Sequence, residues 1–344
     1  MLNPETEKFL QEVLGKGKGT DLANLIEYQS FCGKAEGHSP STINLTALAL
    51  NKLRRYLQES GIPTDVRMIG PQEIREFILH LRNSRRFADH PYTKIQDGTL
   101  SEQTVNDYLR AIRAAWNRWI DEEIVNASPF DKVKVPKAPQ RIIPTFSEDQ
   151  LRAFFSVIDT STPEGFRDLA LFLLYLDTMC RLTEITKARI PNLNLRGRYL
   201  KVIGKGGKER LVPFGMIASK VLWKYIQFYR PEPAIPSYDY LFLTREGGPL
   251  TKNRVEARMK RYGEKAGIKG VRCSPHTLRH TACVMWIRNG GDIFSLQRIT
   301  GHSSLEVLRG YVNLAQGDVT SAHQRHSPID NLNLRVPSSQ RRRE

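Results

Sequence analysis

The sequence predicts a mainly α-helical protein with a small β-sheet, an α+β chain built as two domains. Three observations support this prediction. The chain has 344 residues, more than a single hydrophobic core usually organises. Apolar residues recur at helical spacing over most of its length, whereas β-prone runs are confined to the stretch around residue 205. A basic, proline-rich segment without apolar periodicity separates the two helical regions.

The N-terminal part, residues 1–130, is expected to be a small helical domain. Apolar spacing predicts helices over about 21–32, 41–60, 71–82 and 101–124. Ser39 or Ser41 would cap the second of these, and Pro71 would occupy the first turn of the third. The polar stretch 83–100 contains Gly and Pro, so we expect it to be an exposed loop.

An interdomain linker is predicted over residues 131–145. The overlapping stretch 126–144 holds four prolines and four lysines or arginines. Basic side chains neutralise DNA phosphates and release counterions, so a linker of this kind can follow a DNA backbone. The candidates for that contact are Lys132, Lys134, Lys137 and Arg141.

The second domain is predicted over residues 146–327. Ser147 opens a helix with a capping pattern, and an apolar, buried helix follows over 166–179. Two β-prone runs, 198–204 and 209–214, flank a glycine turn and predict a hairpin. Helices are then expected over about 216–228, 251–266, 277–289 and 293–300, with a basic, disordered tail over 328–344.

The balance of charge points to a polyanionic partner. The chain has 52 Lys+Arg against 36 Asp+Glu, a net charge of +16, which suits DNA, RNA or an anionic membrane. Its longest apolar stretch, 169–176, is too short to span a bilayer, and no secretory leader opens the chain, so we expect no membrane partner and a cytoplasmic location with the nucleoid. The cysteines lack paired spacing, so we expect neither zinc nor disulfides but buried small side chains at Cys32, Cys180, Cys273 and Cys283.

Five short segments of the second domain carry side chains suited to phosphate chemistry. In chain order they contain Arg181 with Glu184, Lys205, His276 with Arg279, Gly301 with His302, and Tyr311. Each alone fits an ordinary structural role: an ion pair on a helix, a turn lysine, a helix cap, a C-terminal glycine cap, a packing tyrosine. The complete set is far less ordinary than its members.

Together these groups supply what metal-free attack on a phosphodiester requires. Arg181 and Arg279 could donate paired hydrogen bonds to the non-bridging oxygens as negative charge develops. A lysine at a hairpin tip could protonate the leaving 5′ oxygen, and histidines could orient the phosphate or assist proton transfer. A covalent link to Tyr311 would conserve the bond energy, so strands could be rejoined without ATP.

These segments resemble the tyrosine recombinase/integrase family, which includes phage integrases, Xer recombinases and Cre-like enzymes. The similarity spans about 146–327. By resemblance, Arg181 and Arg279 would clamp the phosphate, Lys205 would be the general acid, and Tyr311 the nucleophile. His276 and His302 would serve as supporting acid/base or hydrogen-bonding groups, and Glu184 would orient Arg181. Lys208 is the alternative to Lys205 as the hairpin lysine. Lys208 and Arg210 are also expected to contact DNA.

The resemblance also implies an architecture and partners. The N-terminal helices would form a SAM-like core-binding domain that closes a C-shaped clamp around DNA with the catalytic domain. The substrate would be double-stranded DNA with inverted-repeat core sites, cut through a 3′-phosphotyrosyl intermediate and a Holliday junction without metal or other cofactor. A homo-tetramer would form by exchange of a C-terminal segment within residues 318–334.

Two features depart from the family pattern. Met179 and Cys180 replace the small Thr-Gly-Leu context before the first arginine, which could alter its packing. Gly310 precedes the nucleophile, and a glycine inside a helix costs about 1 kcal/mol relative to alanine.

Other functions remain open on sequence grounds. A catalytically silent DNA-binding protein of the same fold and a type IB topoisomerase are alternatives, whereas a metal-dependent nuclease or transposase lacks its carboxylate cluster. Among recombinase roles, integration or excision of a mobile element is favoured by the run 289–314, and Xer-like resolution of replicon dimers is the alternative.

Overall fold

The computed structural model divides the chain into two compact units, Met1–Arg141 and Ile142–Glu344. It describes residues 20–86, 95–135, 144–204 and 207–302, and beyond these only positions 304, 305, 308, 310, 311, 323, 324, 327 and 329–332. The prediction of a mainly helical chain with a small sheet is confirmed. The predicted linker and the basic tail lie largely outside the described residues, so their boundaries stay predictions.

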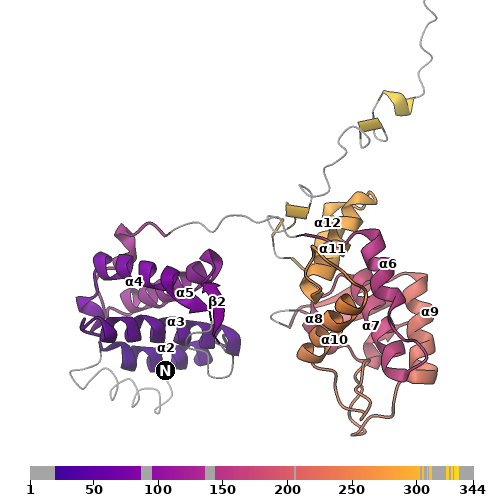
Figure 1. Ribbon diagram of the computed structural model, residues 1–344, viewed down its shortest axis with the longest axis horizontal. Helices are drawn as coiled ribbons and strands as arrows, with labels where there is room; N and C mark the ends of the chain where they lie inside the picture. Colours follow the sequence, from indigo (N-terminus) through magenta and orange to yellow (C-terminus); the bar gives the residue numbers. More distant parts are fainter. Residues whose placement is uncertain are drawn as a thin grey trace, which may run out of the picture. The chain divides into compact units, whose positions relative to one another are not determined.

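Helices build the N-terminal unit (Figure 1). They are α2 (Leu22–Ala35), α3 (Pro40–Glu59), α4 (Pro71–Asn83) and α5 (Glu102–Asp121), joined by 3₁₀ turns at Val66–Met68 and Pro129–Lys132. α3 contacts each of the other three helices. Side-chain caps fix two of the starts, because Ser39 accepts from the amide of Thr42 and Ser101 from that of Thr104. Trp116 and Trp119 of α5 are fully buried in the core of this unit.

The prediction of a plain loop over 83–100 was wrong for part of this segment. Strand β1 (Arg85–Arg86) pairs antiparallel with β2 (Gln96–Thr99). Every residue of both strands is exposed, so there is no alternation of apolar and polar side chains to reveal them. Residues 87–94 lie outside the described part of the chain.

The C-terminal unit combines a three-stranded antiparallel sheet with helices. The sheet has the order β3 (Leu193–Asn194), β4 (Tyr199–Ile203), β5 (Glu209–Pro213), which includes the predicted hairpin. The helices are α6 (Glu148–Ser156), α7 (Pro163–Thr178), α8 (Leu182–Thr186), α9 (Met216–Lys224), α10 (Lys252–Lys265), α11 (Pro275–Arg288) and α12 (Ile293–Thr300). A π-turn, Tyr225–Tyr229, extends α9, and 3₁₀ turns lie at Ile190–Asn192 and Asp330–Leu332.

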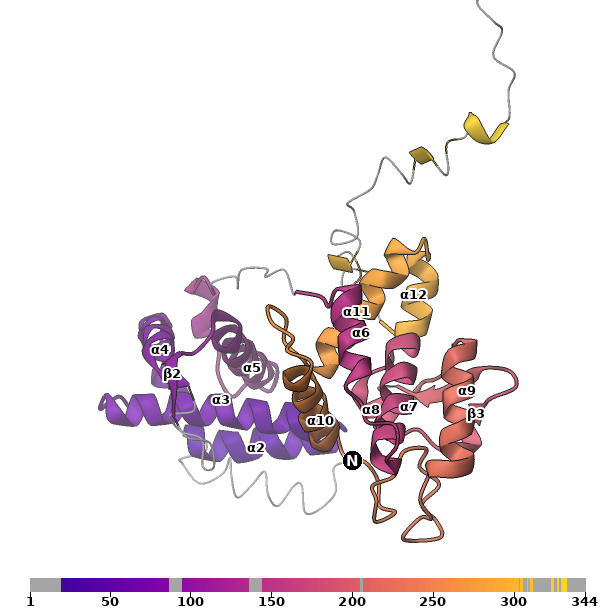
Figure 2. The same cartoon turned by 45° about the vertical axis from the view of Figure 1, so that its right-hand side comes forward.

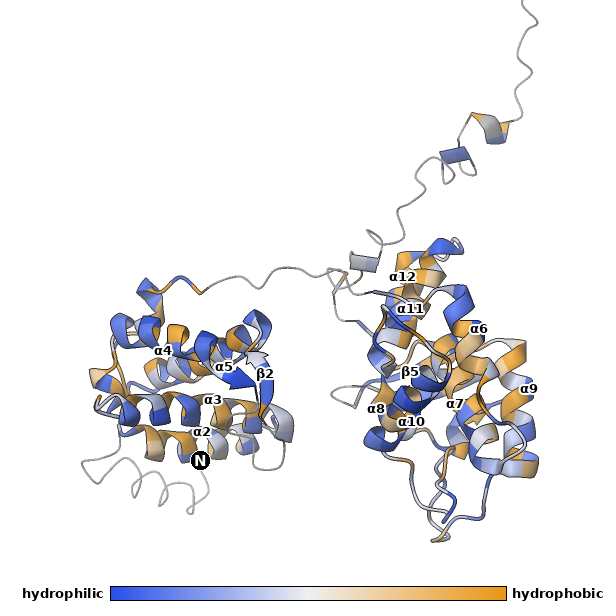
Figure 3. Ribbon diagram, in the orientation of Figure 1, coloured by the Kyte–Doolittle hydropathy of each residue, from blue (hydrophilic) through white to orange (hydrophobic). Residues whose placement is uncertain are grey.

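Burial differs strongly between the helices of this unit. α7 is the central helix and contacts α8, α9 and α11. Figure 3 shows α7 largely in the hydrophobic colour and α10 largely in the hydrophilic one. At the start of α6 the amide of Phe146 donates to Thr281 of α11 at 3.0 Å, and Figures 1 and 2 both show these helices near α12. This end of the unit holds the candidate site.

Two expectations from composition can be compared with the structure. Cys32, Cys180 and Cys283 are buried as expected, while Cys273 is only half-buried. Within the described parts of the chain, no helix combines the length and apolarity needed to cross a bilayer.

Candidate active site

A tight turn at the end of α7 presents Arg181. Met179 ends the helix in the left-handed region with φ 51°, and Arg181 then caps the start of α8. This backbone region costs a non-glycine residue roughly 1–2 kcal/mol. Met179 is 3% exposed, so burial of its side chain offsets that cost. Met179 stands where the family pattern has a glycine, and it still forms the left-handed turn that places Arg181.

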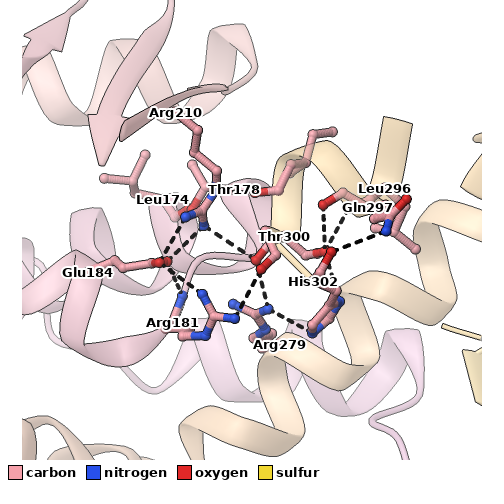
Figure 4. Close-up of polar contacts among 12 residues, drawn as sticks. Leu174, Thr178, Arg181, Glu184, Arg210, Arg279, Leu296, Gln297, Thr300 and His302 are labelled. Carbon is pink, nitrogen blue, oxygen red and sulfur yellow. Dashed lines mark hydrogen bonds and ion pairs between the residues drawn. The ribbon is translucent and has the colours of Figure 1, made fainter. Parts of the chain in front are cut away.

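Glu184 is the carboxylate of the site, and it is shared by two arginines (Figure 4). Its Oε2 accepts from the backbone N–H of Arg181 at 2.7 Å, and its Oε1 lies 3.2 Å from Nη1 of Arg181. Arg210 binds both carboxylate oxygens at 2.8 Å. Burial opposes the charged form of Glu184, but the hydrogen bonds from Arg210 and from the Arg181 backbone outweigh it and lower its pKa. The glutamate is therefore ionised and fully paired.

The second predicted clamp residue, Arg279, is buried on α11. Its Nη2 donates to the carbonyl of Thr300 at 3.1 Å and contacts Nε2 of His302 at 3.1 Å. Its Nη1 is buried and has no hydrogen-bond partner among the described residues. A buried donor without an acceptor costs about 1–3 kcal/mol, so this nitrogen is suited to receive an acceptor from a ligand.

His302 follows Gly301, which ends α12 in the left-handed region with φ 67°. Because arginine can only donate, Nε2 of His302 must accept from Arg279. The ring proton then lies on Nδ1, 2.9 Å from the hydroxyl of Thr300, which donates in turn to the carbonyl of Leu296 at 2.7 Å. Burial, with the charges of Arg279 and Arg181, lowers the pKa of His302 to about 4. The imidazole is therefore neutral at pH 7.

Tyr311 lies within the core of the unit and is 6% exposed. Its ring centroid is 4.8 Å from that of His280 and 6.4 Å from that of His302. Burial raises the pKa of Tyr311 to about 12, and the neighbouring Cys283 thiol adds to the rise. The hydroxyl is therefore protonated at pH 7 and packed against α11.

The cluster carries a net positive charge. Three guanidinium groups, Arg181, Arg210 and Arg279, face one carboxylate, Glu184, beside a neutral imidazole, which leaves +2. The side chain of Arg181 is 40% exposed and can be reached from solvent. Within the described ranges, no group of three or more His, Cys, Asp or Glu side chains is placed to hold a metal ion. The arrangement is that of an anion site.

The structure brings together most, but not all, of the residues predicted for the site. Arg181, Glu184, Arg279 and His302 meet in one hydrogen-bonded network, with Tyr311 beside it. His276 is exposed in the first turn of α11. Lys205, Lys137 and Arg141 lie outside the described residues, while the predicted DNA contacts Lys132, Lys134 and Lys208 are exposed.

The expected DNA contact at Arg210 does not fit the structure. Its side chain is 16% exposed, and its guanidinium is committed to Glu184 and to α12 carbonyls. The reason is the register of the hairpin. Arg210 pairs with Val202 on β4, and both side chains lie on the buried side of the sheet, whereas Lys208 lies at the exposed turn. Position beside the lysine in sequence therefore did not predict position in space.

Sequence reasoning also missed Thr300 and His280. Thr300 is fully buried, its carbonyl accepts from Arg279, and its hydroxyl pairs with His302. His280 packs on Tyr311. Each is the immediate neighbour of a predicted position, Thr300 before Gly301-His302 and His280 after Arg279, and that adjacency was the available signal.

Two known protein families have sequence profiles that match this chain. The sequence profile of the phage integrase family matches residues 144–317, which is 174 of 344 residues. The profile of the phage integrase SAM-like domain matches residues 24–135.

Two related proteins match this chain over nearly their whole length. A tyrosine recombinase XerD of Listeria monocytogenes is 29% identical over 310 residues, covering 89% of this chain and 99% of the relative. A tyrosine recombinase XerC of Chlamydia muridarum is 27% identical over 324 residues, covering 89% and 98%.

Solved structures share the fold at lower identity. The XerH site-specific recombinase bound to palindromic difH substrate, in a post-cleavage complex, superposes with a TM-score of 0.66 at 19% identity, covering 94% of this chain and 89% of that one. The Tn1549 transposon integrase in complex with circular intermediate DNA gives 0.65 at 18% identity, covering 90% and 99%.

Fold and site together define an enzyme that acts on DNA strands. The chain belongs to the phage integrase family. It is a tyrosine-type site-specific DNA recombinase, which breaks and rejoins DNA strands, and the class predicted from the sequence is confirmed.

Proposed function

We propose that Arg181 and Arg279 hold the scissile phosphate of a DNA strand and that Tyr311 attacks it. The observation that carries this proposal is the buried, unpartnered Nη1 of Arg279 beside the half-exposed guanidinium of Arg181, in a cluster of net charge +2. A phosphodiester supplies the acceptor oxygen that Nη1 of Arg279 lacks and can approach the exposed side of Arg181. The charge of both groups stabilises the transition state more than the ground state.

The chemical step is proposed from the roles given to these residues and to Lys205. The Tyr311 hydroxyl gives its proton to a base, for which His276 is the candidate, and its oxygen forms a bond to phosphorus while the bond from phosphorus to the 5′ oxygen breaks. Lys205 gives its proton to that 5′ oxygen, leaving a 3′-phosphotyrosyl link and a free 5′ hydroxyl. A 5′ hydroxyl from a partner strand then reverses the step, through a Holliday junction and without metal, other cofactor or ATP.

The two histidines of the family pattern take different parts. His302 is neutral at pH 7 and joined to Arg279, so we assign it to holding that arginine and, after the arginine turns to the phosphate, to hydrogen bonding. His276 lies exposed one helical turn before Arg279, where it can contact a bound phosphate or assist proton transfer.

We propose that the DNA is double-stranded, with inverted-repeat core sites, and that the two units close around it as a C-shaped clamp. Lys132 and Lys134 are exposed and available to phosphates, as is Lys208 at the hairpin. Lys137 and Arg141 complete the basic linker in sequence. A protein of this kind would reside with the nucleoid in the cytoplasm.

Assembly is proposed as a homo-tetramer held by exchange of the segment 318–334 between neighbouring copies. An apolar hollow of about 410 Å³ in the C-terminal unit offers a receiving surface, lined among others by Leu173, Leu176, Met179, Ile217, Met285 and Trp286. Ile217 is 72% exposed there, as expected for a side chain that awaits a partner.

For the biological role we propose integration or excision of a mobile genetic element, with Xer-like resolution of replicon dimers as the second candidate. The XerD and XerC relatives favour the second and the Tn1549 integrase is consistent with the first. Repeats that flank the gene would mark a mobile element, and a single chromosomal core site would mark dimer resolution.

A nicked suicide substrate tests the proposed chemistry. The core site is taken from those fragments of the DNA flanking the gene that bind the protein. A nick beside the scissile phosphate lets the short fragment with the cut 5′ end diffuse away, so that the strand is not rejoined. We expect a covalent protein–DNA adduct that forms equally with EDTA present. Binding without any adduct would instead identify a catalytically silent protein, and loss with EDTA that magnesium restores would contradict the metal-free step. Relaxation of supercoiled plasmid lacking the core site would favour a type IB topoisomerase.

A further inference from the structure

Arg210 uses most of its donors inside the protein. Besides the two 2.8 Å contacts with Glu184, its Nε donates to the carbonyl of Ile299 at 2.9 Å, and its Nη2 lies 3.4 Å from the carbonyl of Thr300. Figure 4 shows the side chain reaching from its strand toward Glu184. Arg210 therefore joins β5 to α8 and to the C-terminal end of α12.

The first consequence concerns the charge of Arg181. Two-point binding by Arg210 holds both oxygens of Glu184, so Arg181 makes only one side-chain contact with that carboxylate, at 3.2 Å. If Arg210 were absent, the buried carboxylate would have Arg181 as its remaining cationic partner among the described residues. A two-point pair with Arg181 would then cancel the charge intended for phosphate.

The second consequence concerns the position of His302. The last carbonyls of a helix lack partners within the helix, and here arginines supply them. Arg210 binds Ile299, Arg279 binds Thr300, and Arg181 binds the carbonyl of Gly301 at 3.1 Å. Glycine suits this position because its φ is 67° and because a Cβ at 301 would lie only 3.0 Å from Cζ of Arg210. His302 is the next residue, so Arg210 helps to fix where its ring begins.

We infer that Arg210 is a positioning residue for strand cleavage, which keeps Arg181 available to the phosphate and holds the end of α12 beneath His302. It acts through these residues and does not itself contact DNA. This inference rests on the proposed roles of Arg181 and His302.

The test compares cleavage of bound DNA with affinity for DNA. Arg210→Met removes the charge, and Arg210→Lys keeps the charge but loses the two-point geometry. With saturating protein on the nicked substrate, we expect at least a tenfold lower rate of adduct formation for both, with Kd for uncut DNA within about twofold of wild type. Arg189→Lys is the matched control, because Arg189 pairs with Asp239 at an exposed position, and it should change neither quantity.

A second variant separates positioning from simple loss of packing. Glu184→Gln combined with Arg210→Met removes both buried charges, so Arg181 is no longer neutralised. We expect this double variant to cleave faster than Arg210→Met alone. A double variant no faster than the single one would overturn the inference, as would weakened DNA binding with an unchanged rate for Arg210→Lys. Absence of adduct with the wild-type protein would instead overturn the proposed function itself.

Discussion

At the scale of single residues, the site depends on which groups carry charge at neutral pH. Glu184 is held ionised by Arg210, Tyr311 is held protonated by burial, and His302 is held neutral with a pKa of about 4. At neutral pH the three arginines are therefore compensated by the Glu184 carboxylate alone among the residues of this cluster. Tyr311 is buried in this state, so the attack proposed for it requires its hydroxyl to become accessible to the phosphate.

The depressed pKa of His302 predicts a loss of stability in acid. An ordinary histidine titrates near pH 6.5, so between pH 6.5 and 4 the unfolded chain binds a proton that the folded protein excludes. This stabilising contribution is complete above pH 6.5 and lost as pH falls toward 4. Gln can make the same two hydrogen bonds without titrating, so the free energy of unfolding of His302→Gln should fall less steeply over this window. The free energy of unfolding is measured for both proteins by urea denaturation at several pH values from 7 to 4. If it falls equally steeply with pH in both proteins, the assignment is contradicted.

Which site residues were predictable follows from what each does. Arg181, Arg279, His302 and Tyr311 belong to a spaced pattern that predicted them as site residues, and the structure brings them close together. Arg210 acts through a partner 26 residues earlier and through α12 carbonyls about 90 residues later, so its role depends on contacts that spacing along the chain does not reveal.

At the scale of elements, the end of α12 is the most constrained feature of the site. Three successive carbonyls, those of residues 299 to 301, each accept a hydrogen bond from an arginine. Gly301 ends the helix in the left-handed region, and His302 follows directly. The capping residues made most helix starts predictable: Ser147 does form a capping box with Gln150. The hairpin was also predictable because two β-prone runs flank a glycine turn, and in the structure Leu200, Val202 and Val212 of these runs are buried. The β1–β2 pair lacks such alternation and was missed.

Gly301→Ala tests that constraint. A Cβ would add the left-handed cost of roughly 1–2 kcal/mol and press on Arg210, so we expect lower stability and slower cleavage together. Gly290→Ala is the control: its φ of 84° carries the same kind of strain, but a Cβ there meets nothing within 4 Å. It should lower the unfolding free energy by a similar amount while leaving the cleavage rate unchanged. Equal effects of both variants on cleavage, measured on the nicked substrate, would show that strain alone explains the loss.

At the scale of the whole molecule, the chain has two units and a net charge of +16, which favours binding to a polyanion such as DNA. Composition and the proline-rich segment predicted the helical class and two units, and the first family match ends, and the second begins, within that segment.

The most direct test of the account is the identity of the residue joined to DNA. The trapped adduct is digested with protease and nuclease, and the modified peptide is sequenced by mass spectrometry. We predict a nucleotide joined through its 3′ phosphate to Tyr311. Tyr311→Phe should form no adduct while its affinity for DNA stays nearly unchanged. Tyr229→Phe should form a normal adduct, because the ring of Tyr229 stacks on Phe166 away from the site. An adduct on another residue, or one formed by Tyr311→Phe, would contradict the central claim.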